Sequence, residues 1–159
     1  MVVLRNMTLQ EYPVYCDYFI DDYSKEIAEN YGHSIERATE LAIKELNKSF
    51  PNGLESDQHD LLCIEAEINN ELIVVGYLWH SKNISEHSTF IYDFYVSNEY
   101  RGKGFGKQAI CELESQLHAE GIEQIKLRVA YHNKQAFKLY KDSGFIITGY
   151  SLSKKIGVV

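Results

Sequence analysis

Glycines and cations alternate in a short segment in the second half of the chain, where a strand-like run gives way to a helix-like one. The alternation runs through Arg101, Gly102, Lys103, Gly104, Phe105, Gly106 and Lys107. Glycine lets a backbone approach an anion closely and adopt positive φ, and the unpaired N–H groups of a first helical turn point at such a ligand. The segment therefore predicts a phosphate cradle at a helix N-terminus.

The spacing of these glycines separates the cradle from commoner phosphate-binding loops. It reads GxGxG, whereas a dinucleotide-binding fold needs GxGxxG. The GxxxxGK[ST] order is also absent, because Gln108 stands where a Ser or Thr would hold magnesium. A protein kinase would need HRD-type and DFG segments, and the sequence has neither. A nucleotide-phosphate enzyme is thus the weaker interpretation.

A second pattern, NKQAFKLYKDSGF, occupies residues 133–145. Asn133 predicts the N-cap of a short helix and Gly144 predicts its end. Helical spacing turns Ala136, Phe137 and Tyr140 toward the interior. The pattern therefore predicts a helix that presents a tyrosine to whatever lies beneath it.

Together, the two patterns resemble the GNAT N-acetyltransferase superfamily. That family's pyrophosphate loop reads [Q/R]-x-x-G-x-[G/A], which residues 101–106 match, and its second pattern, N-x-x-A-x-x-L-Y-x-x-x-G-[F/Y], matches residues 133–145. The two motifs follow one another in the family's order, and the resemblance covers about residues 70–155. The first 60 residues fit the family by element order alone.

The resemblance implies an acetyl-coenzyme A-dependent N-acetyltransferase in which a primary amine attacks the thioester directly. Strands at 91–96 and 124–129 would splay apart around the pantetheine arm. The implied cofactor-binding residues are Phe94, Tyr95, Val96, Arg101, Gly102, Lys103, Gly104, Phe105, Gly106, Lys107, Asn133, Ala136 and Phe137. Tyr140 is the implied general acid, since a tyrosine pKa of about 10 lies close to that of a departing thiol, about 8.5 to 9.

The general base stays open among several groups. Tyr92 and Asp93 are adjacent, so strand alternation sends them to opposite faces and admits at most one of them to the site. Glu65 and Glu67 share one face of another strand, and a water relay is an equal alternative.

Hydrophobic periodicity and helix-capping residues predict the helices and strands that position these residues. A strand at 2–6 precedes a helix with a Thr8–Glu11 capping box, and Ser34 caps a second helix. Further strands are expected at 61–68, 71–80, 90–96 and 124–129, with helices at 105–120 and after Asn133, and one or two closing strands at 145–156. The predicted order is β-α-α-β-β-β-α-β-α-β.

This order describes an α/β fold, a GNAT-like single domain over residues 1–159 with a mixed β-sheet flanked by helices. By the resemblance, residues 1–60 hold the acceptor-side helices, and residues 61–156 form the sheet and the acetyl-coenzyme A-binding core. The last strands could pair between two subunits, so a homodimer stays open.

Charge and composition restrict the classes of molecule that this chain is expected to bind. Net charge is −7, and residues 1–60 carry all of it, with 12 acids against 5 bases. That imbalance argues against nucleic acid and would favour a cationic amine as acceptor, either a small molecule or a protein lysine. No apolar run is long enough for a membrane span. Three scattered cysteines favour the cytoplasm, and neither they nor the six histidines form a metal-binding pattern.

One alternative shares every feature above: a non-catalytic sensor that binds coenzyme A with the same fold. The sequence also leaves open the identity of the amine and the length of the acyl group.

Overall fold

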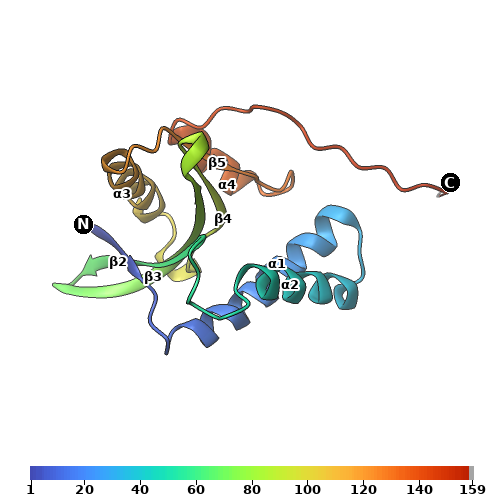
Figure 1. Cartoon of the computed structure of the whole chain (residues 1–159), viewed down its shortest axis with the longest axis horizontal. Coiled ribbons are helices and arrows are strands. Elements are labelled where there is room, and N and C mark those ends of the chain that lie inside the picture. The colour runs from blue at the N-terminus through green and yellow to red at the C-terminus, as the bar shows by residue number, and fades with distance from the viewer. Residues whose placement is uncertain (158–159) are drawn as a thin grey trace.

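A five-stranded sheet forms the centre of the computed structural model, which describes residues 1–157 (Figure 1). The strands are β1 (Val2–Asn6), β2 (His59–Ile68), β3 (Glu71–Asn83), β4 (Ser88–Val96) and β5 (Gln124–Leu127), and they lie in that order. β1 to β4 are antiparallel neighbours, and β5 joins β4 in parallel. The β2–β3 hairpin turns at Asn69 and Asn70, whose φ values of 53° and 66° suit the tight turn that asparagine tolerates.

Within residues 1–157, four helices flank the sheet: α1 (Tyr12–Tyr31), α2 (Ile35–Ser49), α3 (Phe105–Ala119) and α4 (Lys134–Asp142). Short 3₁₀ turns occupy Ile84–Glu86 and Asn98–Tyr100. The Ser34 hydroxyl accepts a hydrogen bond from the Arg37 N–H and caps α2, as expected. The Thr8–Glu11 capping-box hydrogen bonds also form, although α1 itself begins one turn later, at Tyr12.

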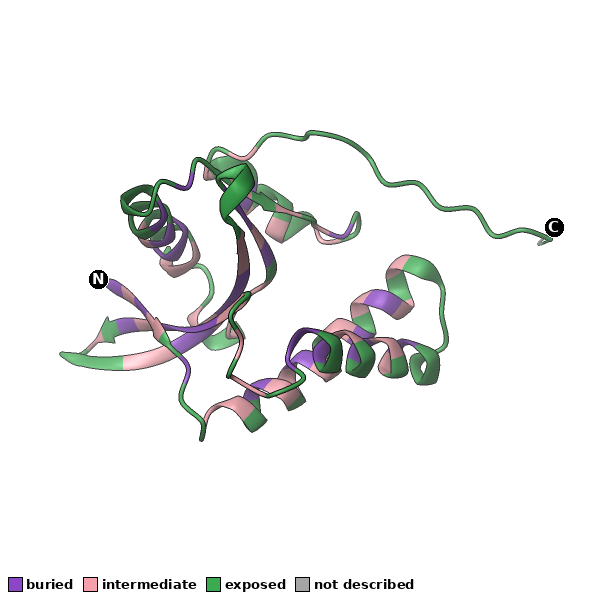
Figure 2. Cartoon of the chain, viewed as in Figure 1, coloured by how far each residue is buried: buried purple, intermediate pink, exposed green. Residues whose placement is uncertain are grey.

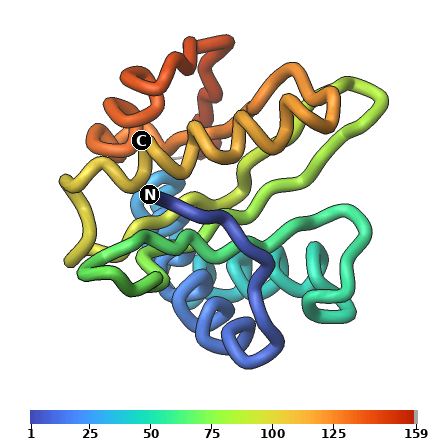
Figure 3. The backbone as a smooth tube through the Cα atoms, turned by 90° about the vertical axis from the view of Figure 1, so that its left-hand side faces the viewer, coloured from blue at the N-terminus to red at the C-terminus, as the bar shows by residue number. Residues whose placement is uncertain are grey.

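The two faces of the sheet carry separate cores, seen as two buried layers in Figure 2. One face packs Ile64, Leu78 and Ile91 against α3, through residues such as Leu113 and Leu117. On the other face, Tyr15 and Phe19 of α1, Leu46 of α2 and Phe50, which follows α2, pack around Trp79. Figure 3 shows the same layering from the side, with α3 and α4 on one side of the strands and α1 and α2 on the other. The sheet therefore holds the two helix pairs apart.

The fold matches the expected single domain with a mixed sheet and flanking helices, but the closing strands predicted at 145–156 are absent. Residues 145–157 instead run as an extended segment without secondary structure, and every side chain from Ile146 to Gly157 is exposed. The alternation that predicted a strand is present. In the structure this segment pairs with no strand of residues 1–157, so no ladder forms.

Other strands differ only at their ends. β2 begins at His59, β3 extends to Asn83, β4 begins at Ser88, and β5 ends at Leu127 rather than at residue 129. None of the helices in residues 1–157 is both long enough and apolar enough to cross a membrane.

Candidate active site

β4 and β5 separate about halfway along β4. β3 pairs with β4 from Ser88 to Val96, whereas β5 pairs with β4 only from Ser88 to Ile91. Beyond Ile91, no strand among residues 1–157 lies beside the edge of β4 that faces β5. The residues along this open edge include Phe94, Tyr95 and Val96, which is the splayed arrangement that the sequence led us to expect. Unpaired backbone groups on a strand edge can bind an extended ligand as an added strand would.

The glycine-rich loop follows the open edge directly. Gly102 and Gly104 have left-handed φ values of 74° and 83°, and Gly104 is the N-cap of α3. A side chain would be strained at either position. The Arg101 Nε donates a hydrogen bond of 2.7 Å to the Val96 carbonyl oxygen, and the guanidinium lies 5.3 Å from the centre of the Tyr95 ring. These contacts fix the loop to the end of β4.

The charge of this loop suits an anion. Arg101, Lys103 and Lys107 are all exposed, and the N–H groups of the first turn of α3 lie among them. Gly102 and Gly104 leave the approach to these groups free of side chains. The residues present therefore fit a pyrophosphate, with its charges met by backbone and cations together.

Gly106 has a different role from the other two glycines. A Cβ built on Gly106 would lie 3.2 Å from a methyl group of Leu139 and 3.6 Å from the Phe94 ring. The absence of a side chain here lets α3, α4 and β4 meet. The phosphate cradle and the tyrosine-bearing helix are therefore in direct contact.

α4 places the predicted tyrosine above this junction. Tyr140 is 9% exposed, and its ring contacts Phe94 and Phe145 edge-on, at centroid distances of 6.3 and 5.6 Å. The Asn133 side chain accepts the Ala136 N–H at 3.1 Å and caps the helix. Ala136 is half-buried, but the inward position expected for Phe137 is wrong: Phe137 is 36% exposed, because α4 packs through a narrow face centred on Tyr140.

Asp93 is the carboxyl group nearest the parting of the strands, and α1 holds it. The Tyr15 hydroxyl donates to Asp93 Oδ2 at 2.9 Å, and the Tyr18 hydroxyl donates to Oδ1 at 3.2 Å. Burial raises the pKa of Asp93 to about 7, against the two tyrosine hydrogen bonds, which lower it. The negative charges of Asp22 and Glu26 raise the pKa of Asp93 further.

A β-bulge explains how Asp93 reaches α1. The register between β3 and β4 slips at Trp79, which pairs with Asp93 while His80 pairs with Ile91, so Tyr92 is the extra residue. The expectation that Tyr92 and Asp93 point to opposite faces is therefore wrong. Tyr92 stacks on Trp79 at 5.0 Å, and Asp93 bonds to α1, so both lie on the α1–α2 face of the sheet.

The other two candidate bases lie elsewhere. Glu65 Oε1 is 3.2 Å from the Arg5 Nε, and the same guanidinium binds both oxygens of Glu11 at 2.8 and 2.9 Å. This cluster joins β1, β2 and the start of α1. Glu67 is exposed beside the hairpin turn. Glu65 and Glu67 therefore lie on β2, away from the place where β4 and β5 separate.

One face of α1 lines the opening. Tyr18, Asp22 and Glu26 follow one another at successive helical turns. The Tyr18 ring lies 4.3 Å from that of Tyr95, and burial raises the pKa of Glu26. The Glu26 charge also raises the pKa values of both Asp93 and Tyr140, although burial is the main cause for each. Two acids, an aromatic ring, Asp93 and Tyr140 therefore meet between α1 and the open edge.

The roles of Tyr15 and Tyr18 were not predicted from the sequence. A signal for them was nevertheless present, because Asp22 and Glu26 follow Tyr18 at intervals of four residues and so lie on the same face of a helix. The arrangement can hold an ammonium group, accept a proton at Asp93 and donate one from Tyr140. Across residues 1–157 no group of three or more metal-binding side chains occurs.

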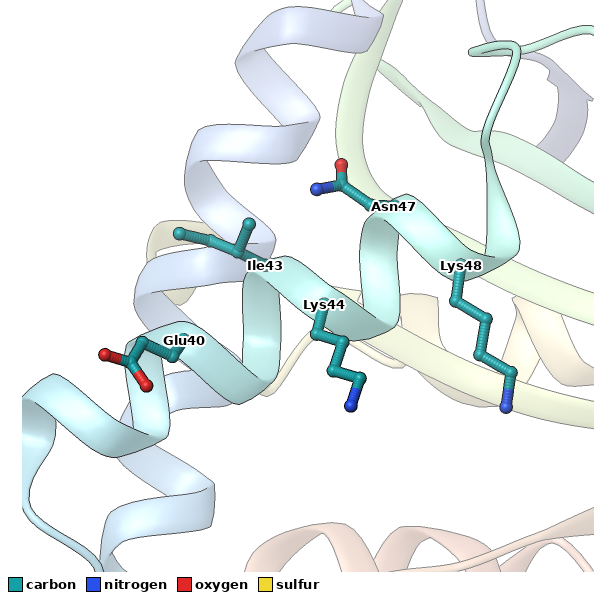
Figure 4. A pocket seen from close by; sticks show the side chains of 5 residues that line it. All are labelled: Glu40, Ile43, Lys44, Asn47 and Lys48. Atoms are coloured by element: carbon teal, nitrogen blue, oxygen red, sulfur yellow. The ribbon is translucent and has the colours of Figure 1, made fainter.

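Two hollows on the surface lie away from this opening. Figure 4 shows one on the exposed side of α2, lined by Glu40, Ile43, Lys44, Asn47 and Lys48. A second lies on the β3–β4 connection and includes Phe90, Tyr92 and Lys126. Neither contains Asp93, Tyr140 or the glycine loop.

Comparisons with known proteins show which family this chain resembles. Residues 15–145 match the model of the Acetyltransferase (GNAT) family. The chain is 34% identical to YycN, an uncharacterized N-acetyltransferase of Bacillus subtilis, over 98% of this chain and 99% of that protein. It is 25% identical to a second one from the same organism, YdgE, over 96% and 97% of the two chains.

Solved structures show the same fold. The crystal structure of YycN superposes with a TM-score of 0.89 at 32% identity, covering 98% of this chain and 99% of that one. Spermidine N-acetyltransferase from Vibrio cholerae, in complex with coenzyme A and spermine, has a TM-score of 0.64 at 17% identity, covering 93% and 82%. At 17% identity, the similarity to the spermidine N-acetyltransferase shows a shared fold alone.

The raised pKa of Asp93 makes a prediction about stability. A carboxyl with a pKa of about 7 when folded and about 3.9 when unfolded binds more protons in the folded state, so its contribution to stability falls as pH rises from about 4 to 7. Asp93→Asn should remove this fall and gain at least ~1 kcal/mol relative to wild type at pH 8. Urea unfolding at pH 5 and pH 8 measures it.

The exposed Asp57 provides a matched control, because Asp57→Asn makes the same charge change without a buried carboxyl. Its stability should follow the wild-type pH dependence. Histidines with lowered pKa values, such as His80, are present in wild type and in both variants, so they contribute the same pH dependence of stability to all three proteins. Parallel pH dependences for wild type and Asp93→Asn would mean that Asp93 titrates normally.

Proposed function

The chain belongs to the GNAT acetyltransferase family and is an N-acetyltransferase, and on that premise we propose that it moves an acetyl group from acetyl-coenzyme A to a cationic primary amine bound between α1 and the open edge of β4. The observation that carries the proposal is the convergence of Asp93, Tyr140 and the acids of α1 beside an unpaired strand edge and a phosphate cradle.

Acetyl-coenzyme A, as second substrate, would supply the thioester that the amine attacks. Residues 101–107 would hold its pyrophosphate, and backbone groups of Phe94, Tyr95 and Val96 would pair with the pantetheine arm. An N–H of this edge would also stabilise negative charge that develops on the carbonyl oxygen, since a fixed donor needs no reorganisation. Asn133, Ala136 and Phe137 would border the thiol end from α4.

Asp93 would act as the proton acceptor. An alkylammonium has a pKa near that of lysine, about 10.4, and must lose a proton before its nitrogen can attack. A carboxyl with a pKa of about 7 is far better matched to this task than one with a pKa of about 4. The hydroxyls of Tyr15 and Tyr18 would orient the carboxylate toward the opening.

Tyr140 would return a proton to the leaving thiolate. Burial raises the pKa of its hydroxyl, so the group stays protonated at neutral pH until a base appears. Within residues 1–157 its hydroxyl makes no hydrogen bond to another side chain, so it is free to donate.

The cradle gives the first prediction of the proposed function. Gly104→Val places a branched side chain at a left-handed position beside the first turn of α3 and should weaken coenzyme A binding more than tenfold, or about 1.4 kcal/mol. Isothermal titration with a chelator present measures this.

Gly121→Val is the control, because Gly121 has a similar φ of 80° at the other end of α3. Both variants should lose stability, and only Gly104→Val should lose affinity. Equal affinities in the two folded variants would place the phosphates elsewhere, and heat with ATP but not with coenzyme A would remove the acetyl-donor assignment.

The general acid is tested by Tyr140→Phe, which keeps the ring and deletes the hydroxyl. We expect coenzyme A affinity to stay close to wild type and the single-turnover acetyl-transfer rate at pH 7 to fall roughly 10²-fold. Tyr92→Phe, at the bulge, serves as the control and should keep the full rate. A wild-type rate in Tyr140→Phe would exclude this role.

Acceptor charge is tested by combining Asp22→Asn with Glu26→Gln. At low salt the kcat/KM for a cationic amine should fall several-fold more than that for a neutral amine of similar size, since only the cation is attracted and the lowered pKa of Asp93 affects both amines alike. The wild-type preference for the cation should also fade as salt rises, because exposed charges are screened over about 10 Å at 0.1 M.

Asp17→Asn with Glu36→Gln changes the same charge on exposed parts of α1 and α2 and should leave both amines unaffected. Equal losses in the two double variants would show a general field rather than a binding site. Tight coenzyme A binding with no turnover of any amine in the panel would favour a sensor.

A further inference from the structure

Arg128 follows the paired part of β5, and its side chain turns toward α1. Leu127 is the last residue of β5 that pairs with β4. The Arg128 guanidinium lies 5.6 Å from the centre of the ring of Tyr31, the last residue of α1. Burial raises the pKa of Glu26, and the Arg128 charge is one of those that lower it, so the two groups are neighbours. Arg128 therefore lies at the C-terminal end of the helix that lines the opening.

This guanidinium binds no oxygen atom in the part of the chain that the structure describes. Each of the other three arginines binds an oxygen: Arg5 that of Glu11, Arg37 that of Glu40, and Arg101 that of Val96. A guanidinium presents five N–H donors in a planar fork that matches a carboxylate. The donors of Arg128 are therefore available to a ligand.

The acid on α1 nearest this end already has a partner. Glu29 Oε2 lies 3.3 Å from His132 Nε2, and this contact joins the connection between β5 and α4 to α1. Asp22 and Glu26 are left to face the opening beside Asp93. The space along α1 thus has an acidic end at the candidate proton acceptor and a cationic end at Arg128.

The two ends are separated by a distance that a small acceptor can span. Tyr31 follows Glu26 by five residues and Asp22 by nine. At 1.5 Å per residue these intervals are about 8 and 14 Å along the helix. A second ammonium group at the far end would meet Arg128 as a like charge, whereas a carboxylate there would form a charge-assisted pair.

We propose that Arg128 binds a free carboxylate of the acceptor, so that the acceptor is an amino acid or short peptide whose side-chain ammonium reacts beside Asp93. The proposal rests on the acceptor site proposed above. Lysine and short lysyl peptides have an ammonium and a carboxylate separated by several ångströms, and each extended residue adds roughly 3.3 Å. The net charge of −7 alone predicts the opposite preference, because it favours an acceptor without the carboxylate.

Matched acceptors that differ only in the carboxylate test this proposal. One pair is Nα-acetyl-lysine and its amide, and the other is Nα-acetyl-lysyl-glycyl-glycine and its amide. In wild type, kcat/KM should be more than about tenfold higher for the acid than for the amide in one pair. The pair with the larger ratio distinguishes an amino acid from a peptide. The difference should lie in KM, because the carboxylate is remote from the reacting atoms.

Arg128→Gln should remove the advantage of the acid and leave kcat/KM for the amide close to wild type. Lys126→Gln is the matched control, because it removes the same charge from an exposed side chain of β5 that lies 3.8 Å from Glu86. This control should keep the preference for the acid. Both positions are exposed, so both variants should fold, which circular dichroism checks.

Equal kcat/KM for acid and amide in wild type, or a preference for the acid that persists in Arg128→Gln, would overturn the proposal. Isothermal titration of the same pairs into protein loaded with coenzyme A measures the preference without turnover. Binding that is selective for the acid and depends on Arg128, but without acetyl transfer, would contradict the proposed function alone. Acetyl transfer without preference for either acid would contradict the role of Arg128 alone.

Discussion

Backbone groups in the middle of a sheet must be paired, yet in the part of the chain that the structure describes β4 has no strand on its β5 side beyond Ile91. This gap is the constraint on which the site depends. α3 begins directly after the gap with its positive end and cations, and Arg101 binds the last carbonyl of β4. The N–H and C=O groups that a longer β5 would have paired are left for an extended ligand, and the cradle lies where that ligand's charged end would fall.

A bulge at Tyr92 gives the opening its chemistry. By inserting one residue, the strand turns Asp93 toward α1 while keeping Ile91 and Phe94 in the core of the other face. The carboxyl is then held by two tyrosine hydroxyls in a poorly solvated place, and its pKa rises toward neutrality. One local irregularity therefore converts a strand residue with an ordinary acidity into a group suited to proton transfer.

Much of this architecture could be predicted from local signals. The Gly-rich loop, the Ser34 and Asn133 caps and the Asn69–Asn70 turn are each encoded within a few residues, and the structure has them in place. Asp93 could not be assigned, because strand alternation holds only for a regular strand and the bulge depends on packing of β3 against β4. The strand predicted after residue 144 has the pattern of a strand but is not one in the structure, because the segment pairs with no strand among the described residues.

Gly106 has a consequence for redesign of the donor site. The three glycines look equivalent in the sequence, yet only Gly106 faces the side chains of another helix, with Leu139 and Phe94 within 3.2 and 3.6 Å of the position of a Cβ. A library that varies the loop to accept a different activated acyl carrier can change Lys103 and Lys107, whose side chains are exposed, without disturbing the interior, whereas Arg101 holds the loop to the end of β4. A larger residue at 106 would push α4 outward and shift Tyr140 with it, so altered carrier selectivity and intact proton transfer can be combined only if that position is left unchanged.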